Sequence, residues 1–200
     1  MRDVKNMAWK NIIGLFVIAA FLILPYQAVA VDSLLVSTIS VSSFTVFSME
    51  FYTDQNVIYS TTVPFSNVDP TKSIVYPNGR RENDGKSDTG VVCLTNIGAP
   101  WHLKVQGVYS EGLPDNAVKF YYSHPWNRNT GNQADGTVTN RVDWLSLPVT
   151  PLTVYTSGTG DLINTPYGTL STFSFAVDPR NLSSERAYTV QITYTMTTTP

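Results

Sequence analysis

One polar stretch of the chain, residues 123–140, is bracketed by aromatic side chains whose chemistry suits sugar recognition. Tyr121, His124, Trp126 and Trp144 flank or belong to a segment rich in Asn, Arg, Gln and Asp. Flat rings cover the apolar face of a pyranose, and amides bond its hydroxyl groups. These four residues are therefore the candidate ligand contacts.

Trp126 is the candidate that we most expect to reach solvent. It follows Pro125 in a polar loop and belongs to no alternating strand, so the core has no obvious need of it. The alternative is that Trp126 folds back to cover the end of a sheet. Tyr122 differs, because it alternates in phase with Val118 and Phe120 and is expected in the core.

Metal ligands do not occur at a recognisable spacing. The two histidines, His102 and His124, form no zinc-binding pattern with each other or with the single cysteine. His102 lies on the polar side of an alternating segment and is expected to be exposed. Glu82, Asp84 and Asp88 offer oxygen ligands for calcium, but the D-x-D-x-D-G spacing is missing. We therefore interpret these acids as part of a solvated charged loop and expect no metal.

Catalytic motifs are also missing. The sequence has no G-x-S-x-G motif and no glycine loop of the phosphate-binding type. Strands can bring distant acids to the roughly 5–10 Å separation of a glycosidase pair, but nothing selects a pair among the scattered carboxylates Glu50, Glu111, Asp115 and Asp143. The chain is predicted to be non-catalytic and to need no cofactor.

Residues 1–30 have the organisation of a secretory signal peptide. A basic start precedes an apolar run over residues 12–24, and Ala28-Val29-Ala30 supplies a small-x-small cleavage site. A membrane anchor is the alternative, but the run is short for a span of about 20 residues. We expect cleavage after Ala30 and a secreted domain over residues 31–200, with no later transmembrane segment.

The charge and the cysteine content limit the possible partners and the redox chemistry. Removal of a leader with three basic residues and one acidic residue changes 13 basic and 15 acidic residues to 10 and 14, a net charge of −4. No basic stripe remains, so nucleic acid and anionic membranes are poor candidate partners. Cys93 is the single cysteine, which excludes an intramolecular disulfide. It lies in the apolar run V-V-C-L and is expected to be buried.

The secreted part has the composition and spacing of an all-β protein. Thr, Ser, Val, Tyr and Phe dominate, turn residues recur about every ten residues, and helix signals are nearly absent. Apolar segments continue on both sides of the two long polar excursions, so one domain is predicted. We expect an antiparallel β-sandwich of the immunoglobulin-like or Greek-key type. Strands are expected at residues 34–42, 44–52, 57–63, 89–96, 101–108, 118–124, 137–144, 152–156, 169–177 and 188–197.

The last strand is expected to be central to the core. Large apolar residues occupy every even position from 188 to 196, and polar residues occupy the odd positions between them. Each fully buried side chain of this kind contributes about 1.5–3 kcal/mol. In the earlier strand that begins at Trp101, Gly107 interrupts a similar alternation and predicts a bulge or a strand end.

These two strands carry motifs that resemble those of the bacterial WxL cell-surface domains. The distal family motif runs Tyr, three residues, Leu-Thr-Trp, one residue, Leu, three residues, Pro, and the C-terminus of this chain keeps every spacing. Tyr188, Thr193 and Pro200 match outright, while Ile192, Tyr194 and Met196 stand for Leu, Trp and Leu. Upstream, Trp101-His102-Leu103 matches the proximal Trp-x-Leu motif. The resemblance covers residues 90–108 and 188–200 and implies a β-rich domain held non-covalently at a Gram-positive cell wall, on peptidoglycan, beside other envelope proteins.

Three classes of function follow from these observations. The preferred one is a secreted, non-catalytic binding or adhesion module of the bacterial cell surface. The second is a structural subunit of a fibre or surface layer, which would self-assemble by pairing an open strand edge with a neighbouring chain. The third is a carbohydrate-binding module, or a weak glycosidase, that uses residues 123–144.

Overall fold

The computed structural model describes residues 31–34, 46–52, 62–66, 68–81, 86–139, 144–182 and 187–200. The leader expected at residues 1–30 lies outside this described part. So do nearly all of the strand expected at 34–42 and most of the one expected at 57–63.

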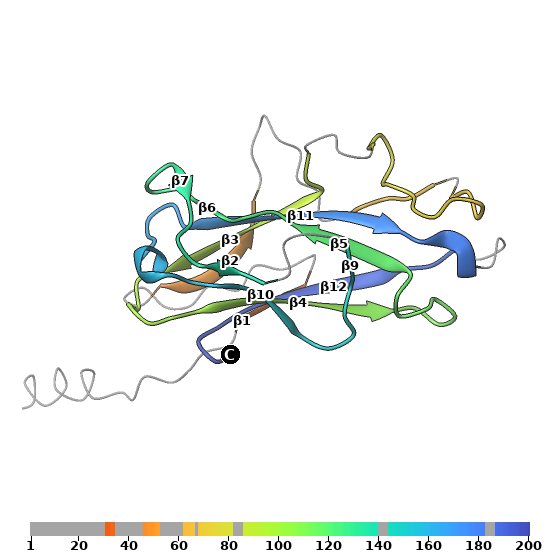
Figure 1. Ribbon diagram of the computed structural model, residues 1–200. Helices are drawn as coiled ribbons and strands as arrows, with labels where there is room; N and C mark the ends of the chain where they lie inside the picture. Colours follow the sequence, from red (N-terminus) through yellow and green to blue (C-terminus); the bar gives the residue numbers. More distant parts are fainter. Residues whose placement is uncertain are drawn as a thin grey trace, which may run out of the picture.

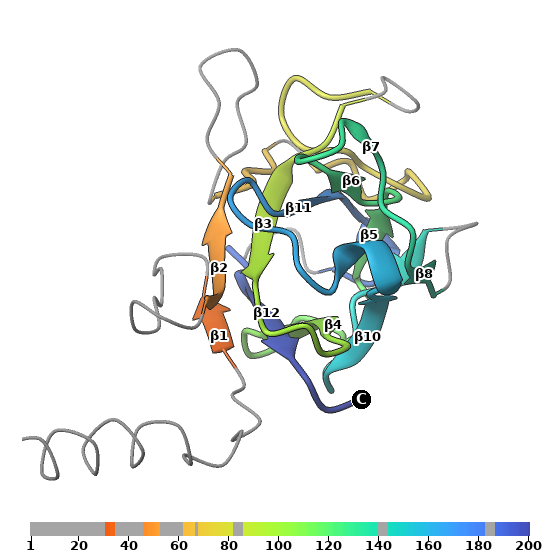
Figure 2. The same cartoon turned by 90° about the vertical axis from the view of Figure 1, so that its left-hand side faces the viewer.

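The chain forms two antiparallel sheets that face each other across one core (Figures 1 and 2). Sheet A has the order β1 (Val31–Leu34), β12 (Val190–Thr197), β4 (His102–Tyr109), β10 (Leu152–Thr156) and β8 (Thr137–Val138). Sheet B has the order β2 (Phe47–Phe51), β3 (Thr89–Thr95), β11 (Thr169–Val177), β5 (Val118–Tyr122) and β9 (Leu145–Ser146). Two short strands extend this sheet, because β6 (Trp126–Asn127) pairs with β11 and β7 (Asn132–Gln133) pairs with β6. Helical structure in the described part is limited to two 3-10 turns, η1 (Thr159–Asp161) and η2 (Pro179–Asn181). The all-β sandwich predicted from the sequence is confirmed.

The order of the strands refines that prediction. The long strands from β3 to β12 alternate between the sheets, so each connection crosses the sandwich and neighbours within a sheet are distant in sequence. Four consecutive strands read β1-β12-β4-β10 in one sheet and β3-β11-β5-β9 in the other. This is the jelly-roll order, which is built from two Greek keys.

Alternation along the strands builds the core. On β12, Ile192, Tyr194 and Met196 point inward and are buried, while Thr193 and Thr195 point outward. Tyr194 packs against Phe173 of the opposite sheet with ring centroids 4.8 Å apart. The expectation that the last strand is central is confirmed, and Cys93 is buried on β3 as predicted.

Two local predictions are wrong. Gly107 neither ends nor bulges β4, which runs on to Tyr109 with Gly107 opposite Ile192. A Cβ at Gly107 would lie 2.7 Å from Cδ2 of Leu147, so the glycine allows a close approach inside the core. Among the described residues of the strand expected at 137–144, only β8 (Thr137–Val138) is a strand, in sheet A, while Thr139 and Trp144 lie outside strands; the next strand, β9, belongs to sheet B.

Candidate ligand-binding surface

The outer face of sheet B carries a row of aromatic side chains along β11. Residues 169, 171, 173, 175 and 177 of β11 are buried toward the core, so residues 170, 172, 174 and 176 face outward. Directly opposed residues of neighbouring strands project on the same face. Trp126 is opposite Leu170, and Tyr121 is opposite Ser174. We call the set Trp126, Tyr121, Trp144 and Tyr76 the aromatic strip.

An extra residue in the chain turns Trp126 to this outer face. Tyr122 pairs with Phe173, and the amide of Ser123 donates to the carbonyl of Thr172 (3.1 Å), so this register continues beyond β5. Trp126 then pairs with Leu170, which means that three residues advance on one strand against two on the other. Such a bulge reverses the side on which the next residue projects.

Trp126 is accordingly 48% exposed, as predicted. Trp126 belongs to no long alternating strand, but it does lie in a two-residue strand, β6, between β11 and β7. Figure 1 shows the β6–β7 ribbon beside β11, and this pairing fixes the backbone that carries Trp126.

The other end of the strip is a cluster of three rings. The Trp144 ring lies 6.1 Å from that of Tyr121 and 5.7 Å from that of Tyr76, in tilted and edge-on arrangements. All three side chains are half-buried. Sequence reasoning missed Tyr76, although the short apolar run Ile74-Val75-Tyr76 before Pro77 was a signal that this segment packs against something.

The two ends are separated along β11. Their partners, Leu170 and Ser174, are four residues apart, which is about 13 Å at about 3.3 Å per residue. The outward residue between them is Thr172, a small hydroxyl side chain. His124 is half-buried in the bulge, where its Nδ1 lies 3.2 Å from the carbonyl oxygen of Pro125. The structure thus joins Tyr121 with Trp144 and places Trp126 farther along the same face.

A buried polar cluster holds the Trp126 end. Asn127 points inward beside Trp126, and its Nδ2 donates to Oδ1 of the fully buried Asp161 (2.8 Å). The hydroxyls of Tyr155 and Thr169 also donate to this carboxylate, the latter at 3.5 Å. The indole of Trp101 donates to the Asp161 carbonyl (3.0 Å). Asp161 is thus tied to strands of both sheets, and its side-chain donors are all uncharged.

This environment shifts the ionisation of the cluster. Burial raises the pKa of Asp161, and the charge of Asp135 raises it further. The hydrogen bonds from Tyr155 and Asn127 act in the opposite direction, because they favour the carboxylate. Burial, together with the adjacent Asp161, raises the pKa of Tyr155, so its hydroxyl keeps its proton and serves as a donor.

Hydrogen bonds join residues 128–129 to residues 164–167 next to Trp126. The Nδ2 of Asn129 donates to the carbonyl of Asn164, and its Oδ1 accepts from the amide of Tyr167 (3.2 Å). The Arg128 guanidinium donates to the carbonyl of Tyr167 (2.9 Å) and lies 4.8 Å above the ring of Tyr52. Residues 127–129 are therefore fixed by several independent contacts.

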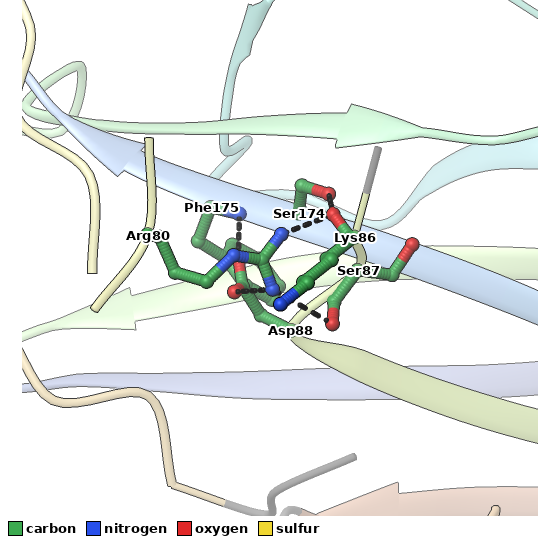
Figure 3. Close-up of polar contacts among 6 residues, drawn as sticks. All are labelled: Arg80, Lys86, Ser87, Asp88, Ser174 and Phe175. Atoms are coloured by element: carbon green, nitrogen blue, oxygen red, sulfur yellow. Dashed lines mark hydrogen bonds and ion pairs between the residues drawn. The ribbon is translucent and has the colours of Figure 1, made fainter. Parts of the chain in front are cut away.

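A second buried acid holds the Tyr76 end (Figure 3). Asp88 accepts from the amide of Phe175 on β11 (2.7 Å) and pairs with the Arg80 guanidinium (3.0 Å). Arg80 also donates to the carbonyls of Ser87 (3.1 Å) and Lys86. Val75 bridges Val177 of β11 through two hydrogen bonds of 2.8 Å, which places the neighbouring Tyr76 over the sheet.

The alternative sites considered from the sequence find little support. His102 is 9% exposed, so the prediction that it is solvent-exposed is wrong. Thr156 and Thr197 flank it on the neighbouring strands, and its Nδ1 lies 2.9 Å from the Thr156 hydroxyl. Burial, with a smaller effect from the charge of Lys104, lowers the pKa of His102.

The acidic candidates are dispersed. Asp88 is engaged with Arg80, and its proposed calcium co-ligands at positions 82 and 84 lie outside the described residues, as does Asp143. Glu50, Glu111 and Asp115 are exposed. Across the described ranges, no group of three or more His, Cys, Asp or Glu side chains is arranged to hold a metal ion.

The residues that carry the family resemblance are mostly structural. Trp101, Leu103, Tyr194 and Met196 are fully buried, and Ile192 is nearly so. Tyr188 and Thr193 are half-buried, and Pro200 is exposed at the C-terminus. A ligand could not touch the buried members without opening the core.

Comparison of the chain with protein families, curated proteins and solved structures finds no match. Within the described part of the chain, no helix has the length and apolar character that a membrane crossing requires.

Proposed function

We propose that this protein is a non-catalytic, glycan-binding module that acts at a bacterial cell surface. The observation that carries the proposal is the outward, half-exposed ring of Trp126, which a bulge directs away from the core. A single exposed ring is ordinary, but this ring shares its sheet face with Tyr121, Trp144 and Tyr76, and grouped aromatic side chains on one face mark a candidate binding surface. The leader-like residues 1–30 and the WxL-like motifs support secretion and attachment to the wall.

The wall polymer would be met by the outer face of sheet B. The motif residues Trp101, Tyr194 and Met196 build the core, so their role is to shape the domain. Contact with peptidoglycan, or another surface glycan, then falls to residues outside the motifs. The aromatic strip offers rings for stacking, with hydroxyl groups of Thr172 and Ser174 between and beside them.

Retention on insoluble cell walls tests this proposal. The purified protein should co-sediment with bacterial cell walls, and Trp126→Ala should reduce the retained fraction severalfold while leaving the melting temperature within a few degrees. Val108→Ala is the matched control, because Val108 is also exposed (55%) but lies in sheet A. A lower melting temperature for Trp126→Ala would show a packing role, and unchanged retention would remove the strip from the site.

A structural subunit is the second candidate, favoured by the open ends of the sheets. In the described strand order, β1 ends sheet A and β2 ends sheet B, and end strands offer unpaired backbone groups to another chain. Size-exclusion chromatography distinguishes the two functions. A surface module elutes as a small species at every concentration, whereas a fibre subunit shifts to larger species as its concentration rises.

A further inference from the structure

We infer that the aromatic strip binds an extended acidic glycan chain lying along β11, and not the end of a chain or a neutral polymer. The inference rests on the proposed function and adds the class of ligand. It depends on the spacing of the two ring platforms and on the charges that stand beside them.

The spacing favours an extended ligand. Trp126 forms one platform, and Tyr121 with Trp144 and Tyr76 forms the other, about 13 Å away by strand rise. A single sugar ring cannot stack on both. A chain of several sugars can contact both at once, and the second contact is then made at the high effective concentration of a tethered group. Thr172 leaves a low, hydroxyl-bearing surface for the sugars between the platforms.

The platforms are preorganised, which suits such a ligand. Asn127 and Asn129 fix the chain on the C-terminal side of Trp126 through Asp161, Asn164 and Tyr167. The Val75–Val177 bridge fixes Tyr76. A rigid surface loses little conformational freedom when a ligand binds, so both contacts contribute fully to the affinity.

The charge beside the strip favours an acidic chain. Lys119 faces outward on β5, two residues from Tyr121, and Arg128 lies two residues from Trp126. The carbonyl of Lys86 accepts from Ser174 on the outer face (3.1 Å), which places this third cationic residue beside the strip. Asp178, just beyond β11, is already paired with Arg180 (2.6 Å). Glu50, which is exposed on β2, projects on the same face, because it is opposite Val92 and Val92 is opposite Leu170. The three cationic residues outnumber this acid, and a net cationic patch complements carboxylate-bearing sugars.

Hyaluronan and chitin oligosaccharides of graded length are the probes. Both contain N-acetylglucosamine, but hyaluronan carries a carboxylate on every second sugar and chitin carries none. Binding is measured by calorimetry with the whole protein. We expect affinity for hyaluronan to rise at least about tenfold once the chain spans both platforms, and chitin of equal length to bind at least about tenfold more weakly.

Variants assign the effect to the strip. Trp126→Ala and Tyr76→Ala should each lower the affinity for long hyaluronan about tenfold, the loss expected for one stacking contact. Disaccharide binding should be affected by at most one of the two substitutions. Lys119→Gln should weaken hyaluronan binding severalfold and leave chitin binding unchanged. Val108→Ala should change nothing, and melting curves verify that each variant is folded.

The outcomes separate the inference from the proposed function. If the disaccharide binds as tightly as the long chain, or chitin as tightly as hyaluronan, the extended acidic chain is wrong while a glycan-binding module remains. If Trp126→Ala alone weakens binding, one platform suffices and the inference is again wrong. If the unsubstituted protein binds neither probe and is not retained on cell walls, both the inference and the proposed function fail.

Discussion

The two ends of the aromatic strip are held by buried aspartates in opposite electrostatic situations. Asp88, at the Tyr76 end, pairs with a guanidinium at 3.0 Å. Asp161, at the Trp126 end, receives its side-chain hydrogen bonds from Asn127, Tyr155 and Thr169, which are neutral. A buried carboxylate with a cationic partner is stabilised as an anion, whereas one with neutral donors retains much of its desolvation cost.

The difference predicts different responses at the two ends. The Asp88 end depends chiefly on the buried Asp88–Arg80 ion pair, which the hydrogen bond from the Phe175 amide supports, and is expected to fail when either partner of the pair is removed. The Asp161 end distributes its interactions over several weaker bonds and is expected to respond to pH. Both ends rest on the same core, so a core substitution provides the reference for either.

The largest effect is expected from that core substitution. Ile192→Ala removes a buried side chain between the sheets and should lower the free energy of unfolding by about 2–5 kcal/mol. Thr193→Ala, on the outer face of sheet A, should cost less than about 1 kcal/mol. Urea denaturation measures both. Equal losses would show that β12 is covered on both faces.

Removal of the guanidinium at the Asp88 end should have the next largest effect. Arg80→Ala leaves Asp88 buried without its cation and should cost about 3 kcal/mol, near the lower end for a buried pair because 16% of the Arg80 side chain is exposed. It should also release the segment that carries Tyr76 and so weaken the binding of long glycans.

Arg180→Ala is the matched control for this prediction. Its pair with Asp178 is shorter, at 2.6 Å, but the Arg180 side chain is 59% exposed. Exposed pairs contribute little, so the free energy of unfolding should change far less than it does for Arg80→Ala. A similar loss of unfolding free energy in both arginine variants would contradict the assignment of Asp88 as the residue that holds the Tyr76 end.

The strands themselves could be predicted well from the sequence. The expected bounds of β10 and β11 agree with the structure, because period-two alternation is a local property of the residues. The jelly-roll order could not be predicted, since β12 pairs with β4 across a long separation in the chain. Nothing local specifies which of two similar strands will be the neighbour.

The candidate site was predicted only in part. Tyr121, Trp126 and Trp144 share one face, but the direction of Trp126 depends on a bulge whose register is set by pairing with β11. Asp161 lies in a polar, glycine-containing stretch that looks solvated, and its burial arises only when η1 docks between the sheets. No local feature of the sequence therefore indicated that Asp161 holds the Trp126 end.

The Asp161 end should show a pH dependence of defined sign. The pKa of Asp161 is raised above the value of about 3.9 for an unfolded Asp, so the folded state binds this proton more tightly. Its contribution to stability is fully present below about pH 3.9 and is lost as the pH rises through the folded pKa. The unfolding free energy of Asp161→Asn is subtracted from that of the unsubstituted protein at each pH. As the pH rises, this difference should fall by a total of about 1.4 kcal/mol for each unit by which the fold raises the pKa.

Asp178→Asn gives the opposite sign and serves as the control. The hydrogen bond from Arg180 lowers the pKa of Asp178 to about 2, so its contribution is present above the unfolded pKa and is lost as the pH falls. If the stability difference attributed to Asp161 also rose with pH, the carboxylate would be stabilised in the fold, and the contrast between the two anchors would disappear.

The smallest effect concerns the reactivity of Cys93, which reports on local opening beside the Asp161 end. The thiol is fully buried, its burial raises the pKa of Cys93, and the Cys93 carbonyl accepts from Nδ2 of Asn164 (2.9 Å). A thiol reagent should therefore label the native protein only as fast as this region opens. Asn164→Ala removes this bond together with those to the Thr169 hydroxyl and the Thr95 amide. It should raise the labelling rate at least about fivefold, the effect of losing roughly 1 kcal/mol.

Arg80→Ala supplies the comparison under conditions in which both variants remain folded. Because Asp88 anchors the other end of β11, local opening around Cys93 should be unchanged in this variant once its lower global stability is taken into account. Equal acceleration in both variants would mean that the two ends open together as one unit. Rapid labelling of the unsubstituted protein would contradict the burial of Cys93 and point to a redox or cross-linking role for this thiol.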